Sequence, residues 1–172
     1  MNQEKFTGKF KAQSAFVTGA ATGIGESCAR KLAGGGASVA VCDINEEGGA
    51  RVAESIQKEG GRAVFIRADL TDWEQARSAV EGFQIEQGRL DIVVHSAGGF
   101  PKYVSLLDCP VEAWDSVVDS NLKTMFYLLK AAAPLMIEGG YGRFVSLSSM
   151  AARSGINPNP PHYTAAKAGV LG

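Results

Sequence analysis

Short apolar runs alternate with longer amphipathic segments along most of the chain. The short runs are rich in valine, isoleucine and phenylalanine, and they have the length of buried strands. We expect strands at residues 14–18, 37–42, 62–68, 90–95 and 143–147. In the longer segments apolar residues recur at helical spacing, and glycines stand where helices would end. We expect helices at residues 23–33, 46–59, about 71–87 and 110–139, and one that begins at residue 163.

Strands that alternate with helices of this length predict right-handed βαβ units, and hence a parallel sheet with helices on both faces. The predicted fold class is α/β, a Rossmann-like doubly wound sheet, with residues 1–172 as a single dinucleotide-binding domain. The usual order has six strands, and this sequence ends within the helix that would precede the sixth. We therefore expect five strands, with the C-terminal strands missing and the domain incomplete at that end.

Two of the helix predictions depend on particular residues. Thr71 is followed three residues later by Glu74, a spacing typical of a capping box at a helix start. Pro110 stands where the first turn of the longest helix tolerates a proline. That helix carries one apolar stripe, a pattern typical of a helix that packs on a core. The stripe consists of Val111, Trp114, Val118, Leu122, Met125 and Leu129.

Composition and charge exclude several classes of function. The chain is 45% apolar and has 17 basic against 18 acidic residues, so its net charge of -1 predicts no nucleic-acid partner. Cys28, Cys42 and Cys109 are scattered, and His95 and His162 stand far apart, so we expect neither disulfides nor a metal site. Without an apolar leader or a run of transmembrane length, we expect a cytoplasmic protein with no membrane partner.

A glycine-rich segment and one carboxylate indicate a nucleotide site. Gly19, Gly23 and Gly25 lie between the first strand and the first helix, where a backbone can approach a pyrophosphate closely. An ordinary turn would also use glycines. Asp43 ends the second strand, 18 residues after Gly25, where a carboxylate can accept hydrogen bonds from both adenosine ribose hydroxyls. It would repel a 2′-phosphate, which favours NAD over NADP. Its alternative role is the N-cap of the next helix.

Polar residues near the end of the chain offer a candidate reactive pair. Tyr163 and Lys167 are four residues apart at a helix start, so their side chains share one face. An ammonium beside a phenol favours the phenolate, although the same spacing also fits a solvated helix face. His162 is interpreted as a loop residue, with the substrate mouth as the alternative. His95 is interpreted as a buried, non-catalytic histidine at a strand end with its hydrogen bonds satisfied.

In combination these segments resemble the short-chain dehydrogenase/reductase family, in its shorter type. The similarity extends from about residue 8 to residue 172, which corresponds to the N-terminal part of a complete member. The matching segments are TGAATGIG at 18–25 (family TGxxxGxG), Asp69 with Leu70, HSAG at 95–98 (family NNAG), Asn121, and YTAAK at 163–167 (family YxxxK). His95 and Ser96 replace the first two asparagines of NNAG, so hydrogen bonds that stabilise the sheet must be remade by imidazole or water.

The resemblance implies a role for each matching residue. Tyr163 would be the acid/base, assisted by Lys167, while Ser149 would hold the substrate oxygen and Asn121 would anchor a water on the proton path. Ser149 is the second serine of SSMA, with Ser148 as the alternative, because the loop to Tyr163 is one residue longer than the commonest spacing. The implied cofactor-binding residues are Gly19, Thr22, Gly23, Ile24, Gly25, Asp43, Asp69, Leu70, Ser96, Ala97, Gly98, Tyr163 and Lys167.

The family implies an NAD(P)-dependent oxidoreductase that interconverts a secondary alcohol and a ketone of small size by hydride transfer. We expect NAD as the cofactor, since Thr22 stands where a basic residue of the glycine-rich loop would bind the 2′-phosphate of NADP. A complete member is expected to form a homodimer or tetramer, and activity of the 172-residue chain alone is doubtful. Two alternatives stay open: a non-catalytic NAD-binding fragment, or a relative of nucleotide-sugar epimerases and dehydratases, whose glycine pattern is usually GxxGxxG.

Overall fold

The fold is one twisted sheet of five parallel strands, seen in a computed structural model that describes residues 8–100, 102–153 and 160–172. The strands are β1 (Ser14–Thr18), β2 (Ser38–Asp43), β3 (Arg62–Arg67), β4 (Ile92–His95) and β5 (Arg143–Ser146). Their order is β3-β2-β1-β4-β5, so the direction of winding reverses between β1 and β4. This arrangement confirms the predicted α/β, doubly wound parallel sheet.

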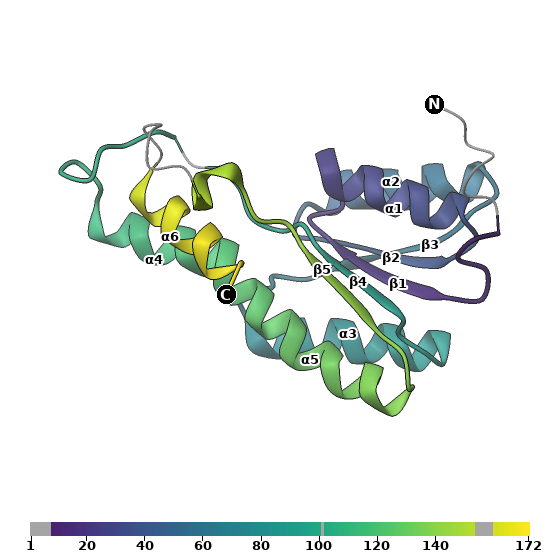
Figure 1. Ribbon diagram of the computed structural model, residues 1–172. Helices are drawn as coiled ribbons and strands as arrows, with labels where there is room; N and C mark the ends of the chain where they lie inside the picture. Colours follow the sequence, from purple (N-terminus) through teal and green to yellow (C-terminus); the bar gives the residue numbers. More distant parts are fainter. Residues whose placement is uncertain (1–7, 101, 154–159) are drawn as a thin grey trace.

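Helices cover both faces of the sheet. One face carries α1 (Gly23–Gly34) and α2 (Glu46–Lys58), and the other carries α3 (Trp73–Gln87) and α5 (Thr124–Glu138) (Figure 1). Beyond the carboxyl ends of β4 and β5 lie α4 (Val111–Val118) and α6 (Pro161–Gly169), side by side (Figure 1). In the part of the chain that the structure describes, no helix is long and apolar enough to cross a membrane.

The core has two layers, which the alternation along each strand explains. In β1, Ala15 and Val17 pack toward α1 and α2, while Phe16 packs toward α3 and α5. Phe16 is fully buried and meets Phe83 of α3 edge to face, with 5.8 Å between ring centroids. Because both faces of the central strands are covered, their residues are apolar almost without interruption.

The start of α3 differs from the predicted capping box. The N-cap is Asp72, whose side chain accepts a hydrogen bond from Gln75 N. Thr71 instead gives both its backbone N–H and its hydroxyl to Asp69 Oδ1, at 2.9 and 2.7 Å. The prediction of a capping box at Thr71 was therefore wrong. Asp72 is an equally good N-cap one residue later, and the Thr71 hydroxyl is already hydrogen-bonded to Asp69.

The longest predicted helix is divided into three segments. A π-helical turn, η2 (Asp119–Lys123), separates α4 from α5, and Pro110 precedes α4 as its N-cap rather than lying in the first turn. The apolar stripe does not face the core: Val111 is 78% exposed and Leu129 40%. A π turn holds more residues than an α turn, so positions before and after it no longer share one face. The buried residues of η2 and α5 are Asn121, Thr124, Leu128, Ala131, Ala132 and Met136.

Candidate functional site

A groove of about 720 Å³ lies at the carboxyl ends of the strands, where the winding reverses between β1 and β4. Ligands of open α/β sheets bind at this position. The groove brings together ten of the predicted cofactor-binding residues. These are Gly19, Thr22, Gly23, Ile24, Asp43, Asp69, Leu70, Ser96, Ala97 and Gly98. Of the other three, Gly25 is buried in the first turn of α1, and Tyr163 and Lys167 lie on α6; none of them lines the groove.

Glycine is required at two points of the segment that joins β1 to α1. Gly19 has a φ of +61°, and a Cβ there would stand 2.8 Å from Ala97 N and from Ser96 O. A Cβ on Gly25 would collide with Gly19 O. The two glycines therefore let the turn pack against the loop after β4 and against its own helix. Thr22, the N-cap of α1, provides no side-chain cap, so the first N–H groups of the helix remain available to an anion.

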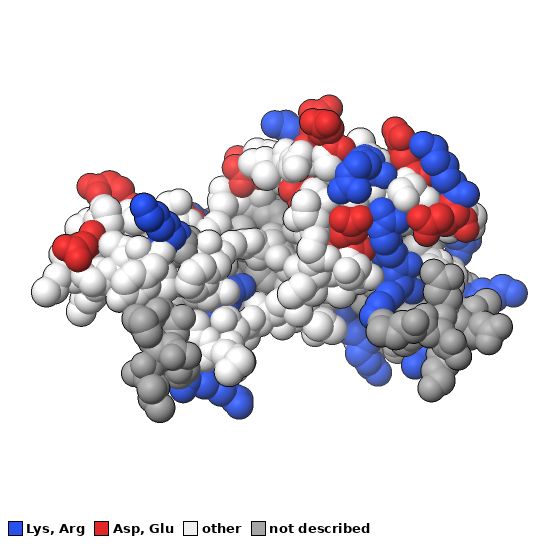
Figure 2. Space-filling view, turned by 90° about the horizontal axis from the view of Figure 1, so that it is seen from above, with Lys and Arg blue, Asp and Glu red and all other residues white. Residues whose placement is uncertain are grey.

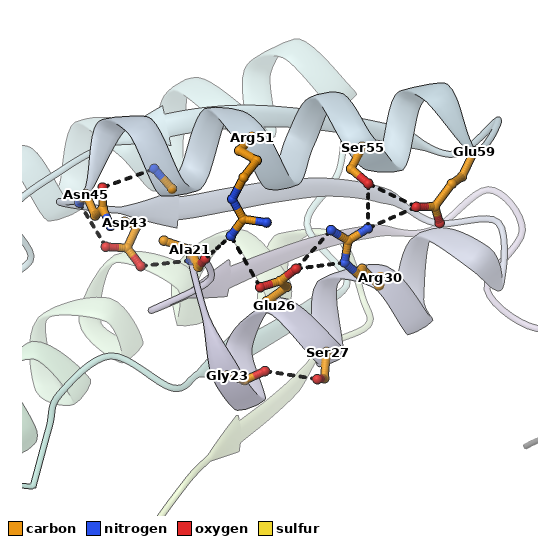
Figure 3. A network of polar contacts seen from close by, with 11 residues as sticks. Ala21, Gly23, Glu26, Ser27, Arg30, Asp43, Asn45, Arg51, Ser55 and Glu59 are labelled. Carbon is orange, nitrogen blue, oxygen red and sulfur yellow. Dashed lines mark hydrogen bonds and ion pairs between the residues drawn. The ribbon is translucent and has the colours of Figure 1, made fainter.

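Asp43 holds this glycine-rich loop from one side (Figure 3). Its Oδ2 accepts a hydrogen bond from Ala21 N and its Oδ1 accepts one from Asn45 N, both at 2.9 Å. The N-cap of α2 is Asn45, which accepts from Gly48 N, so the capping alternative for Asp43 is wrong. The carbonyl of Ala21 is held as well: Arg51 Nη2 donates to Ala21 O at 3.1 Å. Ala21 is thus held at both its N–H and its carbonyl.

A chain of ion pairs continues behind the loop and joins α1 to α2 (Figure 3). Glu26 pairs with Arg51 at 3.6 Å and with Arg30 at 2.9 Å. Arg30 also reaches Ser55 Oγ at 2.9 Å and Glu59 at 3.1 Å. Pairs that are partly exposed to solvent contribute about 0–1 kcal/mol each. The network therefore fixes how the two helices and the loop lie together more than it stabilises the fold.

The loop after β4 is tied to β1. Thr18 Oγ1 accepts hydrogen bonds from Ser96 N at 3.2 Å and Ala97 N at 3.1 Å. Thr18 is fully buried, so its hydroxyl fixes the loop from beneath. The predicted segments at 18–25 and 95–98, which are far apart in the sequence, therefore form one side of the groove.

Tyr163 and Lys167 are both buried on α6 beside the end of β5. The Tyr163 ring packs edge to face against Phe100, with centroids 4.9 Å apart, and Lys167 Nζ lies 5.8 Å from the Tyr163 centroid. Lys167 Nζ donates to Leu147 O at 2.9 Å, and burial lowers the pKa of this ammonium. The solvated-face alternative for the pair is therefore wrong. The structure places an ammonium close to a phenol in a largely dry environment.

The three serines near the end of β5 differ in what their hydroxyls do. Ser148 donates to Lys167 O at 2.7 Å, so its proton is engaged. Ser149 is the N-cap of the short 3-10 helix η3 (Met150–Ala152) and accepts from Ala151 N at 3.2 Å. Ser149 therefore retains a proton for another acceptor, whereas Ser148 acts as a structural link between the strand end and α6. Ser146 lies within β5.

Asn121 lies in the π-helical turn and is fully buried. Its Nδ2 donates to Val117 O at 3.0 Å and to Gly99 O at 3.2 Å, which ties the turn to the loop after β4. No sequence pattern predicted the π turn, although the family resemblance did single out this asparagine. Among the described residues, those able to bind a metal form no group of three or more.

Comparisons with known proteins identify the family. The sequence model of the short chain dehydrogenase family matches residues 13–172. The chain belongs to the short-chain dehydrogenase/reductase family. It is 35% identical over 167 residues to 2-dehydro-3-deoxy-L-rhamnonate dehydrogenase (NAD(+)) of Sphingomonas sp. (strain SKA58), and 37% identical over 164 residues to cyclohexanol dehydrogenase of Acinetobacter sp. (strain SE19). These alignments cover 97% and 95% of this chain but 65% of each relative.

Solved structures of the short-chain dehydrogenase/reductase family share the fold. Carveol dehydrogenase from Mycobacterium avium, solved in complex with NAD, superposes with a TM-score of 0.90 at 34% identity. The match covers 96% of this chain and 64% of that one. In both comparisons the chain spans about two thirds of the length of its relatives: 65% of the two curated dehydrogenases and 64% of carveol dehydrogenase.

His95 is the most visible departure from the family pattern. It is fully buried, and its Nε2 lies 3.0 Å from Thr124 Oγ1. Burial lowers its pKa to about 4, and the charge of Lys167 adds to the effect. The imidazole is therefore neutral near pH 7. The predicted burial of His95 is confirmed, but the prediction that its hydrogen bonds are satisfied holds for Nε2 only, since Nδ1 has no partner among the described residues.

His162 lies in the first turn of α6 and is buried, so its interpretation as a loop residue was wrong. The helix begins at Pro161, two residues before the predicted start. Proline is well suited to the first position of a helix because its φ is already helical and it has no N–H to satisfy. His162 Nδ1 accepts a hydrogen bond from Tyr163 N at 2.9 Å.

Sequence reasoning did not find three residues that shape the site: Arg51, Phe100 and Thr124. Arg51 supports the glycine-rich loop, Phe100 packs on the Tyr163 ring, and Thr124 bonds His95. Each contact joins segments that are far apart along the chain. A pattern read along one segment carries no signal of such a contact.

Proposed function

We propose that this chain is the cofactor-binding and catalytic part of an NAD(P)-dependent oxidoreductase that interconverts a secondary alcohol and a ketone. What carries the proposal is the groove of about 720 Å³ at the reversal of winding, together with the buried Tyr163–Lys167 pair beside the adjoining strand end. Family membership supports the same reaction class.

The residues of the groove fit a dinucleotide. Gly19 lets the turn pack directly on the backbone of the loop after β4, and the uncapped N–H groups of α1 suit a pyrophosphate. Asp43 would hold the adenosine ribose, and Asp69 with Leu70 the adenine. Lys167 would reach the nicotinamide ribose. When bound, the nicotinamide supplies or accepts the hydride.

NAD is the expected cofactor rather than NADP. Both oxygens of Asp43 accept backbone N–H bonds, which hold the carboxylate in one orientation at the proposed ribose position. Such a carboxylate repels a 2′-phosphate. Thr22 places no cation in the loop, and the nearby Arg51 guanidinium is already engaged with Ala21 O and Glu26.

The chain's own residues would handle the substrate oxygen and one proton. The Tyr163 hydroxyl gives or takes the proton, and the Lys167 ammonium stabilises the phenolate form. Ser149, with its hydroxyl proton free of the neighbouring backbone, donates to the substrate oxygen and holds it near Tyr163. Asn121 anchors a water on the path by which protons reach Lys167. The substrate is a small alcohol or ketone.

The exposed apolar surface of α4 and α5 supports self-association of the complete protein as a dimer or tetramer. Val111, Trp114, Phe126 and Leu129 are all at least 40% exposed on these helices. Exposed apolar patches of this kind mark interaction surfaces. A cytoplasmic location stays a prediction.

The reaction is tested with NAD(H) titration and with turnover of a panel of secondary alcohols. The assays use this chain and the chain extended with the C-terminal portion of a relative. Tyr163→Phe should lower kcat by at least about a hundredfold, because it removes the acid/base, while the Kd for NAD stays within about twofold. Tyr141→Phe is the matched control, since Tyr141 is a more exposed tyrosine that precedes β5, at the opposite end of the strand from Ser149. If Tyr163→Phe keeps most of its kcat, the acid/base assignment is wrong.

The same assays separate the alternatives. Tight NAD binding without turnover by either chain would favour a non-catalytic NAD-binding protein. Turnover of nucleotide sugars would favour the epimerase and dehydratase class.

A further inference from the structure

Two buried polar atoms without hydrogen-bond partners lie side by side at the ends of β4 and β5. Among the described residues, His95 Nδ1 and Ser146 Oγ have no partner although both atoms are inaccessible to solvent. His95 and Ser146 are register partners in the parallel pair of β4 and β5. Neighbouring strands lie about 4.8 Å apart, and partnered residues point to the same face of the sheet. The two side chains therefore lie on the face toward α5.

The hydrogen bonds around His95 decide which nitrogen carries the proton. Thr124 Oγ1 donates its single proton to Ser120 O at 3.1 Å. With its proton placed there, it accepts from His95 Nε2, which lies 3.0 Å away. The imidazole is then the Nε2–H tautomer, and Nδ1 is left as an acceptor that needs a donor.

Lys167 supplies a third polar group at the same strand ends. His95 O accepts from Leu147 N at 3.0 Å, and Leu147 O accepts from Lys167 Nζ at 2.9 Å. An ammonium has three N–H groups, and in the described parts of the chain this bond to Leu147 O is the hydrogen bond found for Lys167 Nζ. The electrostatic effect of Lys167 on His95 agrees with their proximity.

We propose that His95 Nδ1 and Ser146 Oγ bind one buried water molecule, with the Lys167 ammonium as its third partner. The water donates to His95 Nδ1, shares a hydrogen bond with Ser146 Oγ and accepts from Lys167. Buried waters typically make about three hydrogen bonds to groups that would otherwise be unsatisfied. An apolar cavity would stay dry, but this location offers a donor, an acceptor and a hydroxyl.

This water makes His95 a positioning residue for Lys167. The ammonium is held by Leu147 O on one side and by the water on the other, so it keeps one place beside the Tyr163 ring. The water site is argued only from the positions of His95 Nδ1, Ser146 Oγ and Lys167 Nζ, so it holds whether or not the chain is an oxidoreductase. Its consequence for catalysis rests on the proposed function, in which Lys167 assists Tyr163.

The test is nuclear magnetic resonance on the whole chain labelled with ¹⁵N at histidine and lysine. We expect the Nε2–H tautomer at His95, and a water cross-peak to the His95 ring that does not arise from exchange. A proton on Nδ1, or no water cross-peak, would overturn the proposal. Neither measurement needs cofactor or turnover, so failure of the water site and failure of the oxidoreductase assignment are distinguishable.

Substitutions test whether the water positions Lys167. In His95→Leu, hydrogen exchange of the Lys167 ammonium should accelerate by about tenfold, the ratio expected from loss of one hydrogen bond. His95→Asn, which keeps a polar side chain, should restore much of the protection. Val94→Ala is the matched control, because Val94 precedes His95 in β4 but packs in the core on the opposite face.

If His95→Leu does not fold, Ser146→Ala provides the same test, since it removes the second partner of the water. Its Lys167 ammonium should also exchange faster than that of Val94→Ala. Equal exchange rates in wild type, Ser146→Ala and Val94→Ala would overturn the positioning role.

Discussion

The two halves of the sheet are built differently. In the half formed by β1 to β3, α1 and α2, the helices bury their apolar faces, and charges of both signs are interspersed over their outer surface (Figure 2). In the half formed by β4, β5 and helices α4 to α6, α4 buries none of its residues fully and a π-helical turn interrupts the helix. All three unpartnered buried side-chain atoms found in the described residues, on His95, Asn121 and Ser146, belong to this second half.

This difference suggests that the first half contributes most to stability, whereas the second half holds the residues proposed for the chemistry. The first half resembles an ordinary core, in which burial of apolar surface supplies most of the stabilisation. The second half carries Tyr163 and Lys167 and leaves polar groups buried among the elements that hold them. Proteins tend to accept such unfavourable features where function requires them. Substitutions in the two halves should therefore differ in size and in kind.

The largest expected difference is between two phenylalanines. Phe16 is 0% exposed and Phe126 is 55% exposed. Phe16→Ala should lower the free energy of unfolding by about 3–5 kcal/mol, because it removes a filled core position. Phe126→Ala should change it by less than about 0.5 kcal/mol and should instead weaken self-association. Urea denaturation measures the first quantity and analytical ultracentrifugation the second. Similar losses of stability in both variants would contradict the comparison.

The next expected effect is a loss of stability in acid that originates in the second half. Burial lowers the pKa of folded His95 from 6.5 to about 4, so the unfolded chain binds a proton in this interval and the folded chain does not. The stability is therefore fully present above pH 6.5 and is lost as the pH falls toward 4. The shift corresponds to about 3 kcal/mol.

Denaturation at a series of pH values measures this loss. His95→Asn removes the titrating group, so its stability should fall less steeply between pH 6.5 and pH 4. His162, the other histidine, serves as the control in His162→Asn. An unchanged slope in His95→Asn would show that other groups cause the loss.

The third expected effect concerns the cofactor site of the first half. Asp43→Asn removes the charge but keeps an acceptor for Ala21 N, so it should narrow the preference for NAD over NADP by about 1–3 kcal/mol. Asp43→Ala also removes the loop contact and should weaken the binding of both cofactors. Calorimetric titration of each cofactor gives the dissociation constants. Tighter binding of NADP than NAD by the wild-type chain would contradict the assignment.

The sequence predicted the first half better than the second for a physical reason. The strands and the helices α1 and α2 follow local patterns of apolar residues and glycines, which a single segment reveals. The π turn at Asp119–Lys123 contains Asn121, whose side chain donates to Val117 O and to Gly99 O, and Gly99 lies in a distant loop. No local pattern reports such a contact.

In the candidate site the division lies between motif residues and contact residues, and it crosses both halves: Tyr163 and Lys167 of the second half were predicted, whereas Arg51 of the first half was not. The motif residues around Gly19 and Asp43 could be found because the backbone conformations and charges that a nucleotide needs restrict the sequence locally. Phe100 and Thr124 could not, since their importance depends on which side chains the fold brings beside them. The start of α3 illustrates a third case, in which Thr71 and Asp72 are both suitable caps and the local hydrogen bond of Thr71 to Asp69 leaves Asp72 as the cap.

The smallest expected effect is in the ion-pair network that joins α1 to α2. Glu26→Gln should lower the free energy of unfolding by about 0.5–1 kcal/mol, because Glu26 pairs with both Arg30 and Arg51 but the pairs are partly exposed. In about 1 M salt, where the Debye length is about 3 Å, the difference from wild type should shrink. Glu54→Gln is the matched control: its pair with Lys58 is far more exposed and should contribute almost nothing. A loss above about 2 kcal/mol that salt does not reduce would indicate that the network stabilises the first half as a buried polar cluster does.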